Sequence, residues 1–293
     1  MKPMTRIEQS LATAIAGSEA HGGPPRLAGA IRHAVFPGGA RIRPQLCLAV
    51  AQACGDDDPG LSEAAATSIE LLHCASLVHD DLPCFDNAAT RRGRASVHYA
   101  YGESLAVLAG DALIVLAFQA LAEAATQSPA RLAPLLATIS HGVGMPFGIV
   151  AGQAWECEPR VSLTEYQRAK TGALFAAATM AGAQAAGANA APWRALGDWL
   201  GEAYQAADDI RDVAGDPLVL GKPVGRDAAL LRPSAAAELG LEGAIALFDR
   251  LVAAAIEAVP PCKGADQLRA LVRMEAERLV PQAMCADLLR AAA

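Results

Sequence analysis

Apolar side chains recur at three- and four-residue spacing through most of the chain. That spacing is typical of α-helices that bury one face, and no convincing alternation of apolar and polar residues indicates a strand. Aromatic residues make up only 4% of the sequence, and alanine occurs in almost every segment. Because small side chains with high helix propensity favour close-packed helices over a sheet, the chain is predicted to be an all-α protein.

Segments that contain Gly and Pro divide this pattern into separate helices. None of them is long enough to be a flexible linker between domains, and no fixed-period repeat is present, so residues 1–293 are predicted to form a single domain. The helices are expected, within a few residues at each end, at 4–19, 25–35, 42–54, 60–83, 104–126, 130–152, 164–187, 192–214, 236–258 and 265–290.

Composition and charge narrow the range of functions. Hydrophobic residues make up 53% of the chain, which is enough for a large core. The formal net charge is −7 and no basic run is present, so no nucleic-acid partner is expected. The seven cysteines are odd in number and form no Cys-x-x-Cys pair. They therefore indicate reduced thiols in a cytoplasmic protein, and argue against a disulfide framework or a structural zinc site.

No membrane span is expected. The N-terminal segment "MKPMTRIEQS" lacks the apolar stretch of a signal peptide. The most apolar later segment, "SLAVLAGDALIVLAFQALAEAA", carries Asp111 in its middle and Glu123 near its end. It is therefore interpreted as a buried helix of a soluble protein.

A first acidic cluster, Asp80, Asp81 and Asp86, lies in "SLVHDDLPCFDN" at the end of a long apolar run. Asp80 and Asp86 cannot share a face of a regular helix, because six residues correspond to a rotation of about 240°. The helix is expected to end or distort there, and Pro83 gives it a reason to do so. Taken alone, such a cluster could also be a solvated helix end or a cap.

A second acidic cluster, Asp208, Asp209 and Asp212, lies in "AYQAADDIRDVAGD". Asp208 and Asp212 are one helical turn apart, and like charges at that spacing destabilise a helix unless a cation bridges them. Mg²⁺ suits such a site, because it prefers oxygen ligands and usually keeps waters and substrate phosphates beside one or two carboxylates. Two acidic clusters on apolar helices predict one cavity with metal ions between facing helices.

Basic residues occur in short segments that contain Gly. Arginine suits bidentate recognition of phosphate, lysine supplies a movable charge, and glycine lets backbone N–H groups approach an anion. Each segment alone could be a solvated loop, but together with the acidic clusters they indicate a diphosphate site. The segments are "FPGGARIRP" with Arg41 and Arg43, "TRRGRASVH" with Arg91, Arg92 and Arg94, "AKTGALF" with Lys170 and Thr171, and "GKPVGRD" with Lys222 and Arg226.

The ordered set "GGARIRP", "HCASLVHDDLPCFDN", "RRG", "KTG", "YQAADDIRD" and "GKPVGRD" resembles the trans-isoprenyl diphosphate synthases from about residue 26 to 227. Within that family the chain is most similar to bacterial geranylgeranyl diphosphate synthases of carotenoid pathways. The resemblance implies a homodimer of all-α bundles, each around a deep cavity. It also implies head-to-tail condensation of isopentenyl diphosphate with dimethylallyl, geranyl or farnesyl diphosphate. A farnesyl diphosphate synthase and a weakly active modulatory subunit are the alternatives.

The resemblance also implies roles for individual residues. Three Mg²⁺ ions per active site, for which Mn²⁺ can substitute, would be held by Asp80, Asp86 and Asp208. Asp81, Asp209 and Asp212 would complete the acidic shell. The allylic diphosphate would be bound by Arg91, Lys170, Thr171, Gln205 and Lys222, and isopentenyl diphosphate by Arg43, His73 and Arg92. The Gln205 side chain and the Lys170 carbonyl would face the allylic carbocation that forms when pyrophosphate departs.

The chain departs from the family pattern at a few positions. Ala40 stands where the family usually has Lys, so Arg41 or a neighbour would compensate or the second substrate would bind more weakly. Ala88 and Ala89 replace acidic residues. Tyr204 replaces a Phe, and Glu156 stands where a Gly-Gln…Asp motif has its Asp.

Product length is predicted from the helix that carries Asp80. Short-chain synthases have a bulky aromatic residue four or five positions before that Asp, where this chain has Ser76 and Ala75. A C20 product is therefore predicted over a C15 product, with Leu72 and Phe118 as candidate floors of the pocket. The alternative is that Ala75 and Ser76 serve only close packing.

Overall fold

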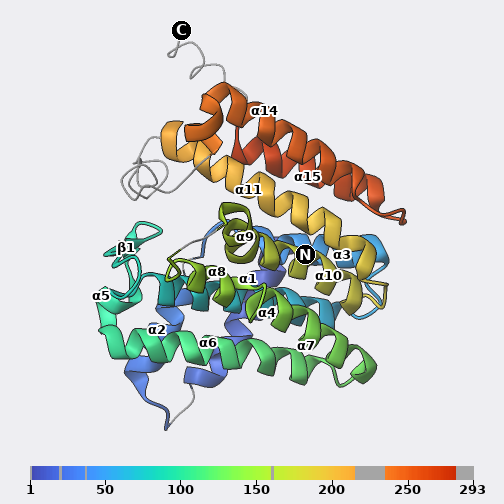
Figure 1. Ribbon diagram of the computed structural model, residues 1–293. Coiled ribbons are helices and arrows are strands. Elements are labelled where there is room, and N and C mark those ends of the chain that lie inside the picture. The colour runs from blue at the N-terminus through green and yellow to red at the C-terminus, as the bar shows by residue number, and fades with distance from the viewer. Residues whose placement is uncertain (1, 20–21, 37, 160–161, 215–234, 282–293) are drawn as a thin grey trace.

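The computed structural model describes residues 2–19, 22–36, 38–159, 162–214 and 235–281 (Figure 1). Its α-helices are α1 Pro3–Ala16, α2 Pro25–Val35, α3 Ile42–Cys54, α4 Pro59–Asp80, α5 Val97–Tyr101, α6 Glu103–Ala124, α7 Pro129–Val143, α8 Ile149–Trp155, α9 Leu163–Gln167, α10 Ala173–Ala185, α11 Arg194–Ala214, α14 Ala235–Glu257 and α15 Ala265–Leu279. Short 3₁₀ turns η1 Gly17–Glu19 and η3 Ala191–Trp193 and a π-helical turn η2 Arg168–Gly172 complete the helical structure described. The all-α prediction is confirmed.

Local chemistry accounts for where several helices begin and end. The helices α1, α2, α4 and α7 each have Pro in the first turn, where its missing N–H costs no hydrogen bond. At the start of α4 the Asp58 carboxylate accepts the backbone N–H of Leu61 at 3.1 Å, as an N-cap residue does. Helix α3 ends at Gly55, whose φ of 115° is readily adopted only by glycine.

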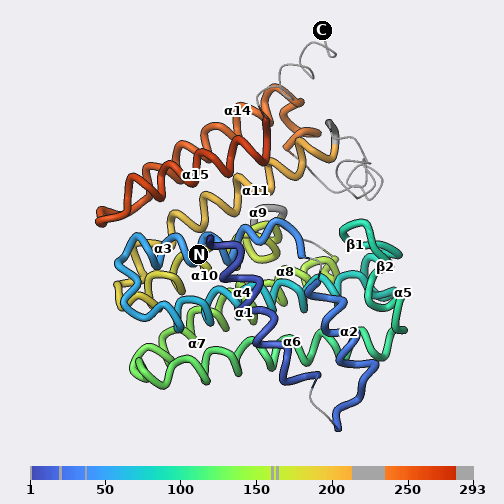
Figure 2. Tube along the Cα trace, turned by 180° about the vertical axis from the view of Figure 1, so that it is seen from behind, coloured from blue at the N-terminus to red at the C-terminus, as the bar shows by residue number. Residues whose placement is uncertain are grey.

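The helices pack in layers, and two of the layers end on the same side of the molecule. Figures 1 and 2 show α6 and α7 along one edge, α14 and α15 along the opposite edge, and α4, α10 and α11 between them. Both α4 and α11 end on the side that carries the small β1–β2 hairpin (Figures 1 and 2). The ends of α4 and α11 carry the first and second acidic clusters.

The expected helix at 130–152 is two helices. Helix α7 ends at Val143 and α8 begins at Ile149, and the segment between them contains the cis bond between Met145 and Pro146. Pro146 has no N–H to donate to a helix, and Gly148 lies so close to the end of α7 that a Cβ there would be 2.3 Å from the carbonyl carbon of Val143. The chain therefore turns sharply between the two helices.

Two smaller features were not predicted. Strands β1 Thr90–Arg91 and β2 Arg94–Ala95 form an antiparallel hairpin, and two residues per strand are too few to show alternation. The expected helix at 164–187 contains the π-helical turn η2. The sequence did not reveal this turn, because one extra residue per turn leaves the apolar spacing nearly unchanged.

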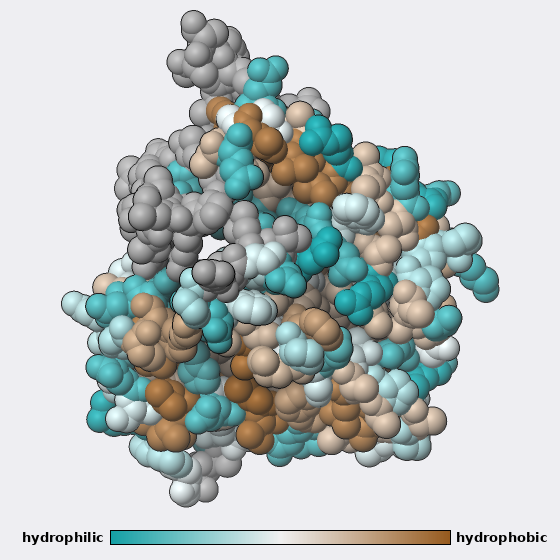
Figure 3. All heavy atoms as spheres, in the orientation of Figure 1, coloured by the Kyte–Doolittle hydropathy of each residue, from teal (hydrophilic) through white to brown (hydrophobic). Residues whose placement is uncertain are grey.

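Helix α6 is less buried than its sequence predicts. It is the one helix in the described part of the chain that is long and apolar enough to cross a membrane by length and composition, a test that core helices also pass. Only 33% of its most apolar window is buried, and Val107, Leu108 and Val115 are exposed. Figure 3 shows apolar side chains along the edge of the molecule over α6. The interpretation as a buried helix holds for one face only.

Candidate active site

Helix α4 ends at Asp80, as the spacing of the first acidic cluster predicts. The chain then turns back, so that the backbone N–H of Asp86 donates to the carbonyl of Asp80 at 3.0 Å. A second bond of this turn joins the N–H of Ala88 to the carbonyl of Asp81 at 3.1 Å. The break in the helix therefore brings Asp86 beside Asp80, which a continuous helix would prevent.

Asp81 points away from solvent and pairs with Arg91. The Asp81 side chain is 3% exposed, and the Nε of Arg91 donates to it at 2.9 Å. Burial raises the pKa of Asp81 above its ordinary value, although Arg91 acts in the opposite direction. The guanidinium of Arg91 also lies 3.7 Å from Asp80. Arg91, expected to contact the allylic diphosphate, is thus held by aspartates of the first cluster in this structure.

Lys170 lies on the other side of Asp80. Its ammonium is 3.3 Å from the Asp80 carboxylate and 2.6 Å from the Glu156 carboxylate. Burial alone would lower the pKa of Lys170, but the charges of Asp80 and Glu156 and the nearby Tyr166 raise it above its ordinary value. Lys170 therefore stays protonated at neutral pH beside the first acidic cluster.

The π-helical turn η2 carries both Lys170 and Thr171 and is held closely from two sides. A Cβ on Gly152 of α8 would lie 2.4 Å from the backbone nitrogen of Lys170, and a Cβ on Gly201 of α11 would lie 2.6 Å from the Cα of Gly172. Only glycine allows this approach of backbone to backbone. Turns of π-helix are frequent at functional sites, and this one lies where substrate-binding residues were predicted.

A chain of hydrogen bonds links this turn to the second acidic cluster. The Thr171 hydroxyl donates to the Gln205 side-chain oxygen at 3.3 Å, and the Gln205 amide nitrogen donates to Asp209 at 2.9 Å. The other oxygen of Asp209 accepts the backbone N–H of Ala235, at the start of α14, at 2.8 Å. Asp209 therefore orients Gln205 and fixes the end of another helix.

The other two acids of this cluster differ in exposure. Asp212 is buried, whereas the Asp208 side chain is 33% exposed and accepts a hydrogen bond from Arg211 at 3.2 Å. Lys222, predicted to bind the allylic diphosphate, lies outside the described residues.

The residues predicted to hold isopentenyl diphosphate include two that are in direct contact. The Arg43 guanidinium donates to the His73 Nε2 at 3.4 Å, and it lies 4.5 Å from the ring centre of Phe175 and 5.5 Å from that of Tyr204. Burial, and then the positive charge of Arg43 and neighbouring arginines, holds the pKa of His73 well below its ordinary value. His73 is therefore neutral at pH 7 and can accept the Arg43 hydrogen bond.

Arg92 completes what we call the cationic group, Arg43, His73 and Arg92. It adopts a left-handed backbone conformation with φ of 53°, and its guanidinium lies against Gly39, where a Cβ would be 2.9 Å from Nε. Within the described residues, no carboxylate lies at ion-pair distance from Arg43 or Arg92. The buried Nε of Arg43 has no hydrogen-bond partner. The group is thus positively charged, and no carboxylate in the described part of the chain pairs with its arginines.

Arg41 does not replace the lysine that is missing at position 40. Its side chain is fully buried and pairs with Glu70 at 2.6 Å and Glu8 at 2.9 Å. It also donates to the carbonyl of Val35 at 2.8 Å. Compensation for Ala40 by Arg41 is therefore wrong, because a buried, paired guanidinium is committed to the fold and cannot turn to a substrate.

The acidic residues can be tested for fit to Mg²⁺ by their donor chemistry. Asp80 and Asp86 offer carboxylate oxygens on either side of one turn, and Mg²⁺ needs only one or two such ligands when waters and phosphates supply the rest. No group of three or more His, Cys, Asp or Glu side chains in the described part of the chain is arranged to hold a metal by itself. The residues fit an ion that arrives with a diphosphate, and the sharing of that ion with Asp208 stays a prediction.

The predicted chain-length residues belong to the main core. Leu72 and Ala75 are buried in it, and Phe118 of α6 packs against the same cluster. The Ser76 hydroxyl donates to the carbonyl of His73 at 2.8 Å. Ala75 and the two candidate floor residues thus lie in one cluster to which α4 and α6 both contribute, and both the chain-length role and the close-packing alternative stay open.

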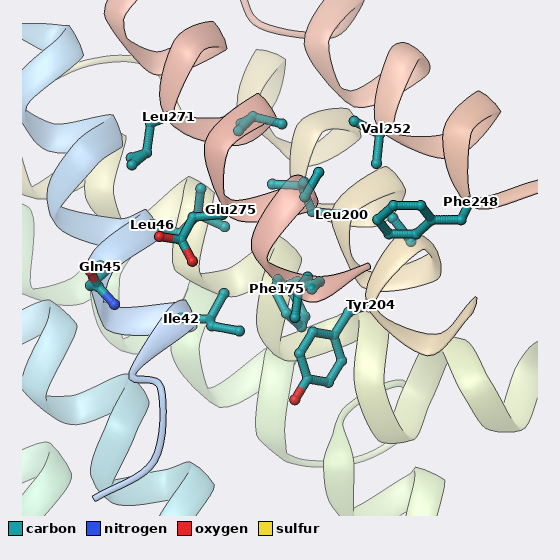
Figure 4. A pocket seen from close by; sticks show the side chains of 14 residues that line it. Ile42, Gln45, Leu46, Phe175, Leu200, Tyr204, Phe248, Val252, Leu271 and Glu275 are labelled. Atoms are coloured by element: carbon teal, nitrogen blue, oxygen red, sulfur yellow. The ribbon is translucent and has the colours of Figure 1, made fainter. Parts of the chain in front are cut away.

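An apolar cavity of about 60 Å³ lies beside the cationic group. Figure 4 shows Phe175 and Tyr204 together on one side of it, with ring centres 5.3 Å apart, and the same two rings lie next to Arg43. Leu271 from α15 and Phe248 from α14 lie on other sides. Sequence reasoning missed this cavity, because its walls come from helices that are distant along the chain.

The sequence and the fold are similar to those of known proteins. Residues 24–256 match the polyprenyl synthetase family. The geranylgeranyl diphosphate synthase of Cereibacter sphaeroides is 53% identical over 281 residues, which is 96% of this chain and 98% of the relative. The geranylgeranyl diphosphate synthase of Rhodobacter capsulatus is 48% identical over 94% of this chain and 95% of its own.

A solved structure gives the class of fold. The crystal structure of an FPP/GFPP synthase from Zymomonas mobilis has a TM-score of 0.78 and 32% identity, and the match covers 93% of this chain and 97% of that one. The described bundle therefore has the all-α fold of the isoprenoid synthases. The chain belongs to the polyprenyl synthetase family.

Proposed function

We propose that this chain is a geranylgeranyl diphosphate synthase, a trans-prenyltransferase that joins isopentenyl diphosphate head-to-tail (1′-4) to an allylic diphosphate. The main observation behind the proposal is that α4 contributes to two differently charged regions, through Asp80 in one and His73 in the other. One is the first acidic cluster with Lys170, and the other is the cationic group, whose arginines have no carboxylate at ion-pair distance among the described residues. Similarity to two geranylgeranyl diphosphate synthases at 53% and 48% identity supports the same activity.

Members of this family depend on a divalent metal for prenyl synthesis, and we propose Mg²⁺, three ions per site, with Mn²⁺ as a substitute. Asp80 and Asp86 would hold it on one side and Asp208 on the other. When bound, the metal supplies the charge that stabilises the departing pyrophosphate. Asp81 supports this arrangement by fixing Arg91 close to Asp80.

The other residues bind, orient and exclude water. Lys170 and Arg91, which lie beside Asp80, donate to the allylic diphosphate oxygens. The Thr171 hydroxyl and the Gln205 amide, ordered by their bonds to each other and to Asp209, direct their dipoles to the reacting carbon. The cationic group binds isopentenyl diphosphate, with neutral His73 orienting Arg43. The apolar residues around these groups keep water from the carbocation.

We further propose a C20 product, with a C15 product as the alternative. The Ala75 side chain is too small to close a pocket between α4 and α6. Leu72 and Phe118 belong to the same apolar cluster and would form a deeper floor. An Ala75→Tyr variant is expected to shift the product toward C15, since the ring would fill that space. Chromatography of the dephosphorylated products measures the shift, and an unchanged C20 profile in a folded, active variant would contradict the pocket-floor argument.

The assembly and setting are proposals too. We infer one domain over residues 1–293 and a homodimer in the cytoplasm, with the product supplied to isoprenoid pathways such as carotenoid synthesis. The exposed apolar face of α6, with Val107, Leu108 and Val115, supports the dimer, because a second copy of that face would cover it. A helix covered in this way needs no membrane.

The decisive experiment is a product assay. Purified protein with Mg²⁺, isopentenyl diphosphate and farnesyl diphosphate is expected to yield a C20 diphosphate. No product above background with Mg²⁺ present would overturn the proposal and leave the modulatory-subunit alternative. Retention of Asp208, Asp209 and Asp212 favours the enzyme, since a non-catalytic partner has no need of the second acidic cluster.

A further inference from the structure

One carboxylate outside both acidic clusters accepts hydrogen bonds from three of the described side chains. Glu156 follows the last residue of α8, and its Oε1 accepts bonds from the Lys170 ammonium and the Tyr166 hydroxyl, each at 2.6 Å. Its Oε2 accepts a bond from the Gln153 amide at 2.9 Å. Both oxygens are therefore held, and the carboxylate has a fixed place against Lys170.

The same helix also fixes the backbone of Lys170. Gly152 lies four residues before Glu156, so the two share one face of α8. At Gly152 a Cβ would lie 2.4 Å from the nitrogen and 2.5 Å from the Cα of Lys170, so the two backbones are in direct contact. Helix α8 therefore fixes Lys170 at both ends, with Gly152 against its backbone and Glu156 against its ammonium.

The ammonium of Lys170 has a second anionic neighbour. It lies 3.3 Å from Asp80 and 2.6 Å from Glu156, and its nitrogen is 5.7 Å from the centre of the Tyr166 ring. A lysine side chain has four flexible torsions, so an ammonium without such contacts would sample many positions. The two carboxylates restrict it to the edge of the first acidic cluster.

We propose that Glu156 is a positioning residue that acts through Lys170. It holds the ammonium beside Asp80 before an allylic diphosphate arrives, and Tyr166 and Gln153 keep its carboxylate in place. This inference rests on the proposed prenyltransferase function and adds a residue to it. Glu156 itself contacts no substrate. The negative charge of Glu156 also partly neutralises Lys170. The lysine is therefore aligned, but it binds the diphosphate of the unreacted substrate less tightly than a free ammonium would.

The proposal predicts a specific kinetic signature. Glu156→Gln removes the negative charge but keeps the size, so Lys170 becomes both less ordered and less neutralised. The kcat with farnesyl diphosphate is expected to fall about tenfold, while the KM for farnesyl diphosphate stays equal or decreases. Lys170→Ala is expected to raise that KM instead. Glu156→Asp keeps the charge on a side chain one methylene shorter, and is expected to recover most of the kcat.

A double-mutant comparison tests whether Glu156 acts through Lys170. In a Lys170→Ala background, Glu156→Gln is expected to cause no further loss, because its target is gone. Tyr166→Phe removes one of the bonds to Glu156 and is expected to lower kcat by about threefold. Glu158→Gln is the matched control, since Glu158 is an exposed glutamate two residues away with no side-chain bond described, and it is expected to behave as the unmodified protein.

The outcomes are distinguishable. If the unmodified chain makes no prenyl product, the proposed function fails. If it is active and Glu156→Gln leaves kcat unchanged, or lowers kcat equally with and without Lys170, the positioning role is overturned. Thermal-shift titration with Mg²⁺ and inorganic pyrophosphate separates binding from turnover. Stabilisation of Glu156→Gln equal to or greater than that of the unmodified protein supports the proposal, and loss of that stabilisation contradicts it.

Discussion

The first acidic cluster and the cationic group each have a member on α4, Asp80 and His73 respectively, yet they satisfy their charges in opposite ways. In the acidic cluster, Asp81 pairs with Arg91 and Asp80 lies close to Lys170. In the cationic group, Arg43 lies on aromatic rings with its Nε unpaired. An ion pair must be rearranged before a ligand binds, whereas a guanidinium that has no carboxylate partner among the described residues can gain its first anionic partner from the ligand. This difference supports the proposal that one region binds a metal-bound diphosphate and the other a metal-free diphosphate.

The largest effect is expected from the acidic side. Asp80→Asn removes a proposed metal ligand and the charge that holds Lys170, so kcat is expected to fall by on the order of 10²–10³-fold. The loss should not be restored by raising Mg²⁺, and steady-state assays over a Mg²⁺ series measure it. Asp266→Asn is the matched control, because the Asp266 side chain is 98% exposed on α15. A variant at Asp80 with normal kcat would show that the acidic region does not carry the metal-dependent step.

The next effect is expected from the cationic side and should be selective. Arg43→Gln removes the stacked guanidinium, so the KM for isopentenyl diphosphate is expected to rise about tenfold or more, while the KM for farnesyl diphosphate changes little. Initial rates with each substrate varied in turn measure both constants. The matched control is Arg194→Gln, at an exposed arginine on α11 that pairs with Asp198. Equal increases in both KM values would show that the cationic group does not bind isopentenyl diphosphate selectively.

The sequence predicts these two regions unequally well. Helix boundaries can be predicted from apolar spacing, and the acidic clusters can be recognised from the repulsion between neighbouring carboxylates. Both are properties of residues close together in the sequence. Ion pairs cannot be predicted in this way, because their partners are distant along the chain. Arg41 was considered as a substrate ligand, but Glu8 and Glu70, 33 and 29 residues away, hold it in the core. The contacts of Glu156 with Lys170 likewise depend on how α8 packs against η2. The sequence showed only that Glu156 stands at the acidic position of a Gly-Gln…Asp motif.

Backbone irregularities explain most of the remaining differences. The π-helical turn at Arg168–Gly172 and the break between α7 and α8 both leave the apolar periodicity almost intact, so spacing alone cannot reveal them. Glycines at 148, 152 and 201 were the available signal, because each lies where a neighbouring backbone approaches too closely for a Cβ. Close approach becomes evident only when both partners are placed in space.

A smaller effect is expected from adding charge to the cationic group. Ala40 is exposed in the loop before α3, next to Gly39, on which the Arg92 guanidinium lies. Ala40→Lys is expected to lower the KM for isopentenyl diphosphate by about threefold, since a solvent-exposed charge contributes only modestly. Ala40→Gln, of similar length and no charge, is the control. If the lysine and glutamine variants have the same KM, the cationic group is already complete without a residue at 40.

The smallest effect concerns protonation within the cationic group. Burial and the nearby arginines hold the pKa of His73 well below its ordinary value of 6.5. Below pH 6.5 the unfolded chain therefore binds a proton at His73 that the folded protein does not, so the free energy of unfolding decreases as the pH falls. In His73→Gln this part of the pH dependence is expected to disappear. Urea unfolding at pH 7.0 and 5.5 measures it for both proteins. If the free energy of unfolding decreases equally in the unmodified protein and in His73→Gln, His73 is protonated in the folded protein. The assignment of neutral His73 as the acceptor of the Arg43 hydrogen bond would then be wrong.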